Sequence, residues 1–294
     1  MSSHLVILNP VAGRGRVRRE WPRMAERLRA AGVQFDFVET TAPGAGIGLA
    51  ERAARDYDAV IAAGGDGTVH EVANGLLRAG GRAALGVLPL GSGDDFVKML
   101  PARDAVARIV VPEVRALDAG RIRAGDAERF FANGMDIGFG AHGAHNIRKV
   151  PRFLTGLGAY LGALFLTLVR YPRLQVRMHI DGAPPTDQAT TMTAVMNGCA
   201  FGGSFHVCPD AHADDGELDL FVAEALGRLE ILALVPRIMR GTHVGDPRLR
   251  LARTRRVLIE SEAPLLVEAD GEIVFEDAHR LEVEVLPSAL RVLA

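Results

Sequence analysis

The first third of the chain alternates short apolar runs with segments in which apolar residues recur every three or four positions. The apolar runs predict strands at 5–8, 35–38, 59–62 and 86–90. The periodic segments predict helices at 21–28, 49–55, 69–77 and 105–110. Strands that alternate with helices are typical of a parallel sheet covered by helices. We therefore expect an N-terminal doubly wound α/β domain.

The pattern changes near residue 115, and shorter alternating strands follow. They are predicted at 114–124, 128–133, 174–180, 191–197, 217–222, 256–261 and 281–285, with helices at 155–170 and 228–239. Such spacing favours an antiparallel β-sandwich-like or barrel domain. A chain of 294 residues is long enough for two domains, so we place a boundary near residue 115.

The segment 153–169 contains no charged residue and could be mistaken for a membrane span. It is shorter than the roughly 20 residues that a spanning helix needs, and it contains Gly156, Gly158 and Gly162. A buried helix is the favoured interpretation. A surface that touches anionic lipid stays open, because basic residues flank the segment at Arg148, Lys149, Arg152, Arg170 and Arg173.

The composition excludes several functional classes. The chain has 34 Lys and Arg against 36 Asp and Glu, a formal charge of −2, so no overall positive field favours nucleic acid. The 2 cysteines, Cys199 and Cys208, cannot build a disulfide framework. We therefore expect a cytoplasmic protein with no nucleic-acid partner.

The strongest chemical signal is the segment from Gly64 to Thr68, GGDGT, between a buried strand and a helix. Glycines let backbone N–H groups approach phosphate oxygens, and the helix N-terminus adds its positive dipole end. The carboxylate of Asp66 would repel phosphate unless Mg²⁺ stood between them or a hydroxyl proton needed an acceptor. The alternative is a glycine turn in which Asp66 caps the helix. The segment spells neither the Walker loop nor the dinucleotide fingerprint.

Together with Glu71-Val72 and Asn74-Gly75-Leu76, this segment resembles the GGDGT-x-x-EV-x-NGL signature of the diacylglycerol kinase catalytic domain, which bacterial lipid kinases and sphingosine kinases share. NAD kinases and phosphofructokinases have a similar GGDG core. Further blocks resemble the family in its order: Asn9-Pro10 with Gly13, the segment 89–96, the segment 209–219 and Asp270-Gly271-Glu272. The five blocks span nearly the whole chain.

The resemblance implies an ATP-dependent lipid kinase that phosphorylates a hydroxyl of a lipid such as diacylglycerol. It implies a nucleotide-binding α/β domain of residues 1–115 with 288–294, a β-rich domain of residues 116–287, and an active site in the cleft between them. The lipid would be met at a membrane surface, so the cytoplasmic enzyme would be peripheral to the membrane. A homodimer is left open.

The resemblance also assigns roles to individual residues. Nucleotide contacts are implied at Asn9, Thr40, Gly64, Gly65, Asp66, Gly67, Thr68, Val69, His70 and Ser92. Asp66 is implied near Mg²⁺ and the γ-phosphate, and Glu272 as the general base. A second Mg²⁺ site is implied at the side chain of Asp215 and the carbonyls of His212 and Glu217. From the residues alone, 214–216 reads as a β-turn and 269–272 as a hairpin turn.

The chain departs from the family where Ser92 and Asp94 replace its threonine and asparagine. Serine keeps the hydroxyl, whereas Asp94 puts a charge where the family has a neutral amide. Beside phosphates this charge should lower nucleotide affinity unless a metal compensates. The charge at Asp94 leaves open a nucleotide-binding protein that has lost turnover. The shared GGDG core leaves open a soluble-substrate kinase of the NAD kinase type, although the blocks at 209–219 and 270–272 speak against it.

Overall fold

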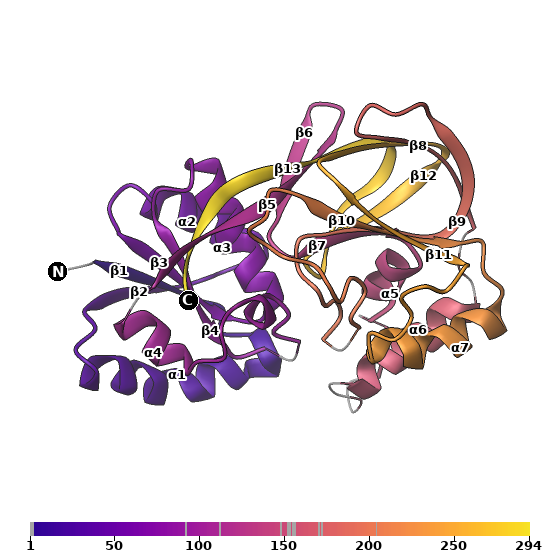
Figure 1. The fold of residues 1–294 in the computed structure, drawn as a ribbon. Coiled ribbons are helices and arrows are strands. Elements are labelled where there is room, and N and C mark those ends of the chain that lie inside the picture. Colours follow the sequence, from indigo (N-terminus) through magenta and orange to yellow (C-terminus); the bar gives the residue numbers. More distant parts are fainter. Residues whose placement is uncertain are drawn as a thin grey trace. The chain divides into compact units, whose positions relative to one another are not determined.

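A computed structural model describes residues 3–91, 93–111, 113–147, 149–151, 154, 157–169, 171, 173–203 and 205–294 (Figure 1). The chain forms two compact units, Met1–Ala119 with Pro287–Ala294, and Gly120–Leu286. The strands β5 (Val114–Ala124) and β13 (Glu272–Leu293) each belong partly to one unit and partly to the other.

The first unit is built on a parallel sheet. Its strands are β1 (His4–Leu8), β2 (Phe35–Glu39), β3 (Ala59–Gly64) and β4 (Ala84–Pro89). They lie in the order β2-β1-β3-β4. The end of β13 joins this sheet in parallel beside β4, with Val292 opposite Leu85. This order places a topological switch point between β1 and β3, where ligands of open α/β sheets bind.

Helices cover both faces of this sheet (Figure 1). They are α1 (Ala12–Ala30), α2 (Ala45–Ala53), α3 (Asp66–Arg78) and α4 (Ala105–Val110), and a 3₁₀ helix, η1 (Phe96–Met99), follows β4 in the chain. On α1 the residues Val17, Trp21, Ala25 and Leu28 are buried, at the spacing of one helical face. They pack on alternate strand residues, and α2 and α3 pack together. The predicted α/β arrangement is confirmed.

The second unit is a β-rich structure whose sheet closes on itself. Its further strands are β6 (Ala127–Phe131), β7 (Gly134–Gly138), β8 (Leu174–Ile180), β9 (Thr186–Met196), β10 (Leu218–Glu224), β11 (Leu249–Thr254) and β12 (Arg256–Ala269). The strands β7 and β8 each pair with both β9 and β12. Alternating apolar residues of these strands form one core. The predicted antiparallel β-rich class is confirmed.

Three helices accompany the strands of this unit: α5 (Phe139–Ile147), α6 (Leu157–Val169) and α7 (Arg228–Met239). Asn146 Nδ2 of α5 donates to Thr167 Oγ1 of α6 at 3.1 Å. No helix of the described residues is long and apolar enough to cross a membrane.

Several element predictions need correction. The strands predicted at 256–261 and 281–285 are parts of the longer β12 and β13. The elements β7, α5 and β11 were not predicted. Of the helix predicted at 155–170, residues 155, 156 and 170 lie outside the described residues, as do Arg148 and Arg152 of its basic flanks.

Candidate phosphate-binding and catalytic residues

The carboxyl edge of the parallel sheet collects several of the residues predicted to contact nucleotide. Asn9 follows β1 and donates its backbone N–H to Ala63 O at 3.1 Å. Thr40 follows β2 and donates its backbone N–H to Leu8 O at 2.8 Å. Gly64 ends β3 on the same edge. The edge is the one at which α/β sheets bind ligands.

One glycine of the GGDGT segment, Gly65, lies in close backbone contact with Gly91 of the loop after β4. A Cβ on Gly65 would lie 3.2 Å from Gly91 Cα, and a Cβ on Gly91 would lie 2.5 Å from Gly65 Cα. The loops after β3 and β4 therefore touch through glycine backbone. Thr68 N and Val69 N both donate to Gly65 O, at 2.9 and 3.1 Å, which starts α3 directly after the turn. The helix N-terminus thus points its dipole at this loop pair.

The glycine of the Asn9-Pro10 block meets the same loop pair. Gly13 has a φ of +56°, and a Cβ there would lie 2.9 Å from Leu90 O. Arg14 and Gly15 are also left-handed, so the first residues of α1 form a turn rather than regular helix. Glycine is the residue that accepts this conformation and this approach without strain.

Asp66 joins the loops after β3 and β4. Its Oδ1 accepts the backbone N–H of Asp95 at 2.7 Å. Burial, and then the charges of Asp95 and Asp94, raise the pKa of Asp66 to about 6. The sequence predicted the carboxylate in the loop, but its hydrogen bond to the second loop was not anticipated.

Asp94 has its own structural role in the second loop. Its φ is +49°, a conformation in which Asp and Asn are enriched. Its Oδ1 accepts the backbone N–H of Gly91 at 3.2 Å. Burial raises the pKa of Asp94, whereas the Gly91 hydrogen bond and the Arg16 charge lower it. The neighbouring Ser92, predicted to contact nucleotide, lies outside the described residues.

The loops after β3 and β4 carry the carboxylates of Asp66, Asp94 and Asp95, and carboxylate oxygens are the ligands that Mg²⁺ prefers. Asp66 and Asp94 are crowded by like charge, and Asp95 Oδ1 accepts from Lys98 Nζ at 2.5 Å. Among the described residues, no group of three or more His, Cys, Asp or Glu side chains could hold a metal by itself. Mg²⁺ is commonly held by one or two carboxylates together with substrate phosphates. Asp66 therefore fits a metal shared with phosphates.

The second unit holds Glu272 directly after a tight hairpin turn. Asp270 and Gly271, with φ of +51° and +93°, connect β12 to β13, and Ala269 lies opposite Glu272. Both positive φ values are those of a type I′ turn. The hairpin predicted at 269–272 is confirmed. Glu272 is half-buried at the first position of β13.

Asp270 fixes this hairpin against the preceding part of the sheet. Its carboxylate accepts the backbone N–H groups of Ala132 and Asn133 at 2.9 Å each and of Gly134 at 3.0 Å. A carboxylate held by several backbone donors is a strong structural anchor. Asp270 therefore sets the position from which Glu272 projects.

A buried carboxyl pair lies behind the hairpin and was not predicted. Asp136 on β7 lies opposite Glu268 on β12, and both are 0% exposed. Asp136 Oδ1 accepts from Ala141 N at 2.6 Å, and Glu268 Oε1 accepts from Gly271 N. The other oxygens, Asp136 Oδ2 and Glu268 Oε2, are buried without a donor among the described residues. Burial raises the pKa of Asp136 to about 7 and that of Glu268 well above its usual range, which favours the neutral, protonated form of these carboxyls.

The substitution Asp136→Asn is expected to flatten the pH dependence of the free energy of unfolding. Burial raises the pKa of Asp136 to about 7 in the native state, whereas an unfolded Asp titrates near about 3.9. Between these two pH values the native state binds more protons than the unfolded state. The contribution of Asp136 to the free energy of unfolding is therefore complete below the unfolded pKa and is lost as the pH rises toward the folded pKa. Urea unfolding at several pH values between about 4 and 8 measures the slope. The exposed variant Asp126→Asn is the control; equal slopes in both variants would contradict this role of Asp136.

Two of the three residues predicted to hold a second metal, Asp215 and Glu217, have side chains paired with arginines. Asp215 accepts the backbone N–H of Glu217 at 3.1 Å and pairs with the Arg253 guanidinium. Glu217 pairs with Arg253 at 3.1 Å and Arg255 at 3.5 Å. Of the three predicted ligands only Asp215 would use its side chain, and that carboxylate is paired with the Arg253 guanidinium; the ligands at His212 and Glu217 would be backbone carbonyls. The assignment of His212, Asp215 and Glu217 stays a prediction, and no step is derived from it.

The fold and the loop pair define a class: a nucleotide-dependent phosphotransferase with an α/β unit and a β-rich unit. Residues 3–122 match the family description "Diacylglycerol kinase catalytic domain", and residues 133–294 match "YegS C-terminal NAD kinase beta sandwich-like domain". The chain belongs to the diacylglycerol kinase catalytic-domain family. The resemblance inferred from the sequence blocks is confirmed.

Individual relatives agree with this assignment over nearly their whole length. A diacylglycerol kinase of Mycobacterium tuberculosis is 31% identical over 294 residues, which cover 98% of this chain and 93% of the relative. A diacylglycerol kinase of Bacillus subtilis is 27% identical over 274 residues, covering 91% and 88%. A solved Bacillus anthracis structure, described as that of a candidate diacylglycerol kinase, is 25% identical with a TM-score of 0.79 and covers 99% and 97%.

Proposed function

We propose that the protein is an ATP-dependent lipid kinase that transfers the γ-phosphoryl group to a hydroxyl of a lipid such as diacylglycerol. The observation that carries this proposal is the Gly64–Thr68 turn with Asp66 at the carboxyl edge of a parallel sheet, in a chain that matches the diacylglycerol kinase family along its length. Phosphoryl transfer asks a protein chiefly to position groups and to stabilise charge. A glycine turn before a helix N-terminus suits that task.

In this proposal the first unit binds ATP at Asn9, Thr40, the segment 64–70 and Ser92. Asp66 would hold Mg²⁺ against the phosphates. When bound, Mg²⁺ would neutralise negative charge on the γ-phosphoryl group during its transfer. Backbone N–H groups at the start of α3 would orient the phosphate oxygens.

Glu272 is the proposed general base of the second unit. Its carboxylate would accept the proton of the lipid hydroxyl while the hydroxyl oxygen bonds to the γ-phosphorus and the bond to the β,γ-bridging oxygen breaks. The products are the phosphorylated lipid and ADP. Asp270 would act as a positioning residue, because its three backbone hydrogen bonds hold the hairpin that carries Glu272.

The finer organisation is also proposed. Residues 1–115 with 288–294 would form the nucleotide-binding domain and residues 116–287 the lipid-substrate domain. The enzyme would work in the cytoplasm, peripheral to a membrane whose lipid it phosphorylates. These statements follow from the family and from the expected substrate.

The test of the proposed function is an assay with γ-labelled ATP, Mg²⁺, mixed membrane lipids and, separately, NAD. We expect label in a lipid. Label in NAD would replace this proposal with a soluble-substrate kinase. ATP binding without transfer to either acceptor would indicate a protein that has lost turnover, an alternative that the charge at Asp94 favours.

The substitution Asp94→Asn is expected to tighten ATP binding about tenfold, because it removes a negative charge beside the phosphates. Asparagine keeps the oxygen that accepts from Gly91 N and tolerates the φ of +49°, so the loop should persist. Titration of ATP at fixed Mg²⁺ measures the change, with the exposed Glu26→Gln on α1 as the control for loss of one charge. Weaker binding with a lower dependence on Mg²⁺ would mean that Asp94 holds the metal.

A further inference from the structure

The helix α6 exposes an apolar face. The side chains of Leu161, Phe165 and Val169 are 42%, 66% and 53% exposed, and that of Leu166 is 40% exposed. The first three are four residues apart, so they form one line along the helix. The opposite side of α6 is buried. A helix of a water-soluble protein ordinarily carries polar residues on its outer face, and α6 contains no charged residue.

The start of α7 extends this face. Arg228 donates from Nε and Nη2 to the carbonyls of Leu168 and Val169, at 3.0 and 2.9 Å, which ties the end of α6 to the start of α7. On α7 Leu229 is 81% exposed and Leu232 is 45% exposed. We name the set the α6–α7 apolar surface: Leu161, Phe165, Leu166, Val169, Leu229 and Leu232. A cluster of this kind marks an interaction site.

A basic pocket adjoins this surface. Its volume is about 540 Å³, and Tyr171, Arg173, Gly227, Arg228, Leu229 and Glu230 line it. Arg173 and Arg228 are exposed and bring two positive charges. Leu229 belongs to both the pocket and the apolar surface. The pocket therefore places cationic groups at the rim of exposed apolar side chains.

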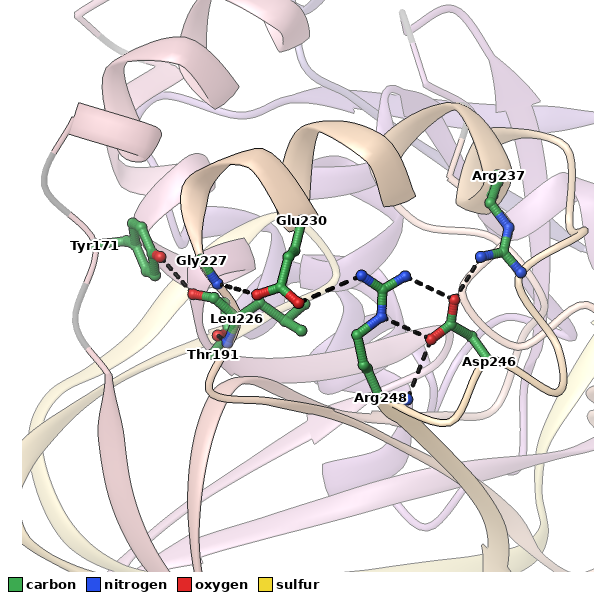
Figure 2. A network of polar contacts seen from close by, with 8 residues as sticks. All are labelled: Tyr171, Thr191, Leu226, Gly227, Glu230, Arg237, Asp246 and Arg248. Atoms are coloured by element: carbon green, nitrogen blue, oxygen red, sulfur yellow. Dashed lines mark hydrogen bonds and ion pairs between the residues drawn. The ribbon is translucent and has the colours of Figure 1, made fainter.

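The acidic residues near the pocket are neutralised within the protein (Figure 2). Glu230 accepts from Gly227 N at 2.7 Å and pairs with Arg248 at 3.5 Å. Asp246 pairs with Arg248 at 2.9 Å and also with Arg237. The Gly227 N–H lowers the pKa of Glu230, and the Arg248 hydrogen bond lowers that of Asp246, so both stay ionised and balanced. The charges of Arg173 and Arg228 are then left in excess.

We propose that the α6–α7 apolar surface docks on a bilayer that contains anionic lipid. Its leucines and Phe165 would enter the interfacial region of the bilayer, between the headgroups and the acyl chains. The pocket of Arg173 and Arg228 would lie against the phosphate of a lipid headgroup. Apolar side chains rimmed by cations are the combination that binds anionic bilayers. This inference rests on the proposed function, because a kinase for a bilayer lipid needs a surface that meets the bilayer.

Flotation with vesicles of phosphatidylcholine, with and without phosphatidylglycerol, tests the surface. Phe165→Glu and Leu229→Glu should each lower the partition onto anionic vesicles at least about tenfold. The control is Val111→Glu in the first unit, where Val111 is 68% exposed. Arg173→Gln should lower binding to anionic vesicles and leave binding to neutral ones unchanged. Unchanged binding of both Glu variants would overturn the proposal.

Turnover on a short-chain diacylglycerol dispersed as monomers separates docking from catalysis. On this substrate the two Glu variants should stay within about twofold of the wild type, since surface substitutions perturb little else. On long-chain substrate in vesicles their turnover should fall with binding. A wild type that binds vesicles but phosphorylates no lipid would refute the proposed function and leave the docking surface standing. Sedimentation could show instead that the Glu variants break a dimer while vesicle binding is unchanged. The α6–α7 apolar surface would then be covered by a second copy of the chain, and the proposal would fail.

Discussion

Replacing Asp66 by asparagine or alanine is expected to lower phosphoryl transfer at least about a hundredfold, the scale on which electrostatic groups act in transition states. The carboxylate is the proposed link between metal and phosphates. Asparagine keeps an oxygen that can accept the Asp95 N–H, whereas alanine removes the hydrogen bond that joins the two loops. The two variants therefore separate loss of charge from loss of the loop contact. Steady-state kinetics with ATP and thermal unfolding measure both effects.

The control for Asp66 is Asp56→Asn, an exposed carboxylate of the same unit. It should keep wild-type turnover. The Asn variant should unfold near the wild-type temperature, because it preserves the loop contact and relieves crowding with Asp94 and Asp95. A folded Asn variant within about tenfold of wild-type turnover would remove the carboxylate from the mechanism.

The first unit was predictable from sequence because its signals are local. Each apolar run that ends in glycine, asparagine or proline is followed by a helical repeat, and the strand-to-helix turns give the carboxyl edge directly. The segment 64–68 was recognisable for the same reason. The hydrogen bond of Asp66 to Asp95 is not local, since 29 residues separate the two.

The second unit was less predictable because tertiary packing decides its elements. The helix α5 has the sequence FGAHGAHNI, whose two glycines lower its intrinsic helix propensity. It is held by Asp136, whose carboxylate accepts the Ala141 N–H at its start, and by packing on α6. The strands β12 and β13 are longer than the apolar segments that predicted them, because each strand pairs with several neighbouring strands along its length. No window of sequence contains those partners.

The same limit applies to the carboxylates around Glu272. The tripeptide Asp270-Gly271-Glu272 signals a turn, but the three donors of Asp270 come from residues more than a hundred positions earlier, with separations of 136 to 138. The pair of Asp136 and Glu268 is formed across β7 and β12 by register alone. A sequence can therefore identify Glu272 by family resemblance, whereas the support of its hairpin emerges only from strand pairing.

The substitution Glu272→Gln is expected to lower turnover at least about a hundredfold while ATP affinity stays at the wild-type value. Glutamine has the shape of glutamate but cannot take the hydroxyl proton. The hairpin should stay intact in this variant. Its geometry depends on the turn residues Asp270 and Gly271 and on the backbone pairing of Ala269 with residue 272, and the substitution changes only a side chain. ATP titration and turnover on a dispersed diacylglycerol measure the two quantities separately.

The matched control is Glu276→Gln, an exposed glutamate four positions further along β13. It removes the same charge from the same strand and should leave turnover unchanged. If Glu272→Gln binds ATP normally and still turns over within about tenfold of the wild type, Glu272 is not the base. If both variants lose turnover equally, turnover depends on the total negative charge of β13 and not on a proton acceptor at residue 272. Only a loss confined to Glu272, with ATP binding preserved, fits a group that acts on the acceptor hydroxyl and not on the nucleotide.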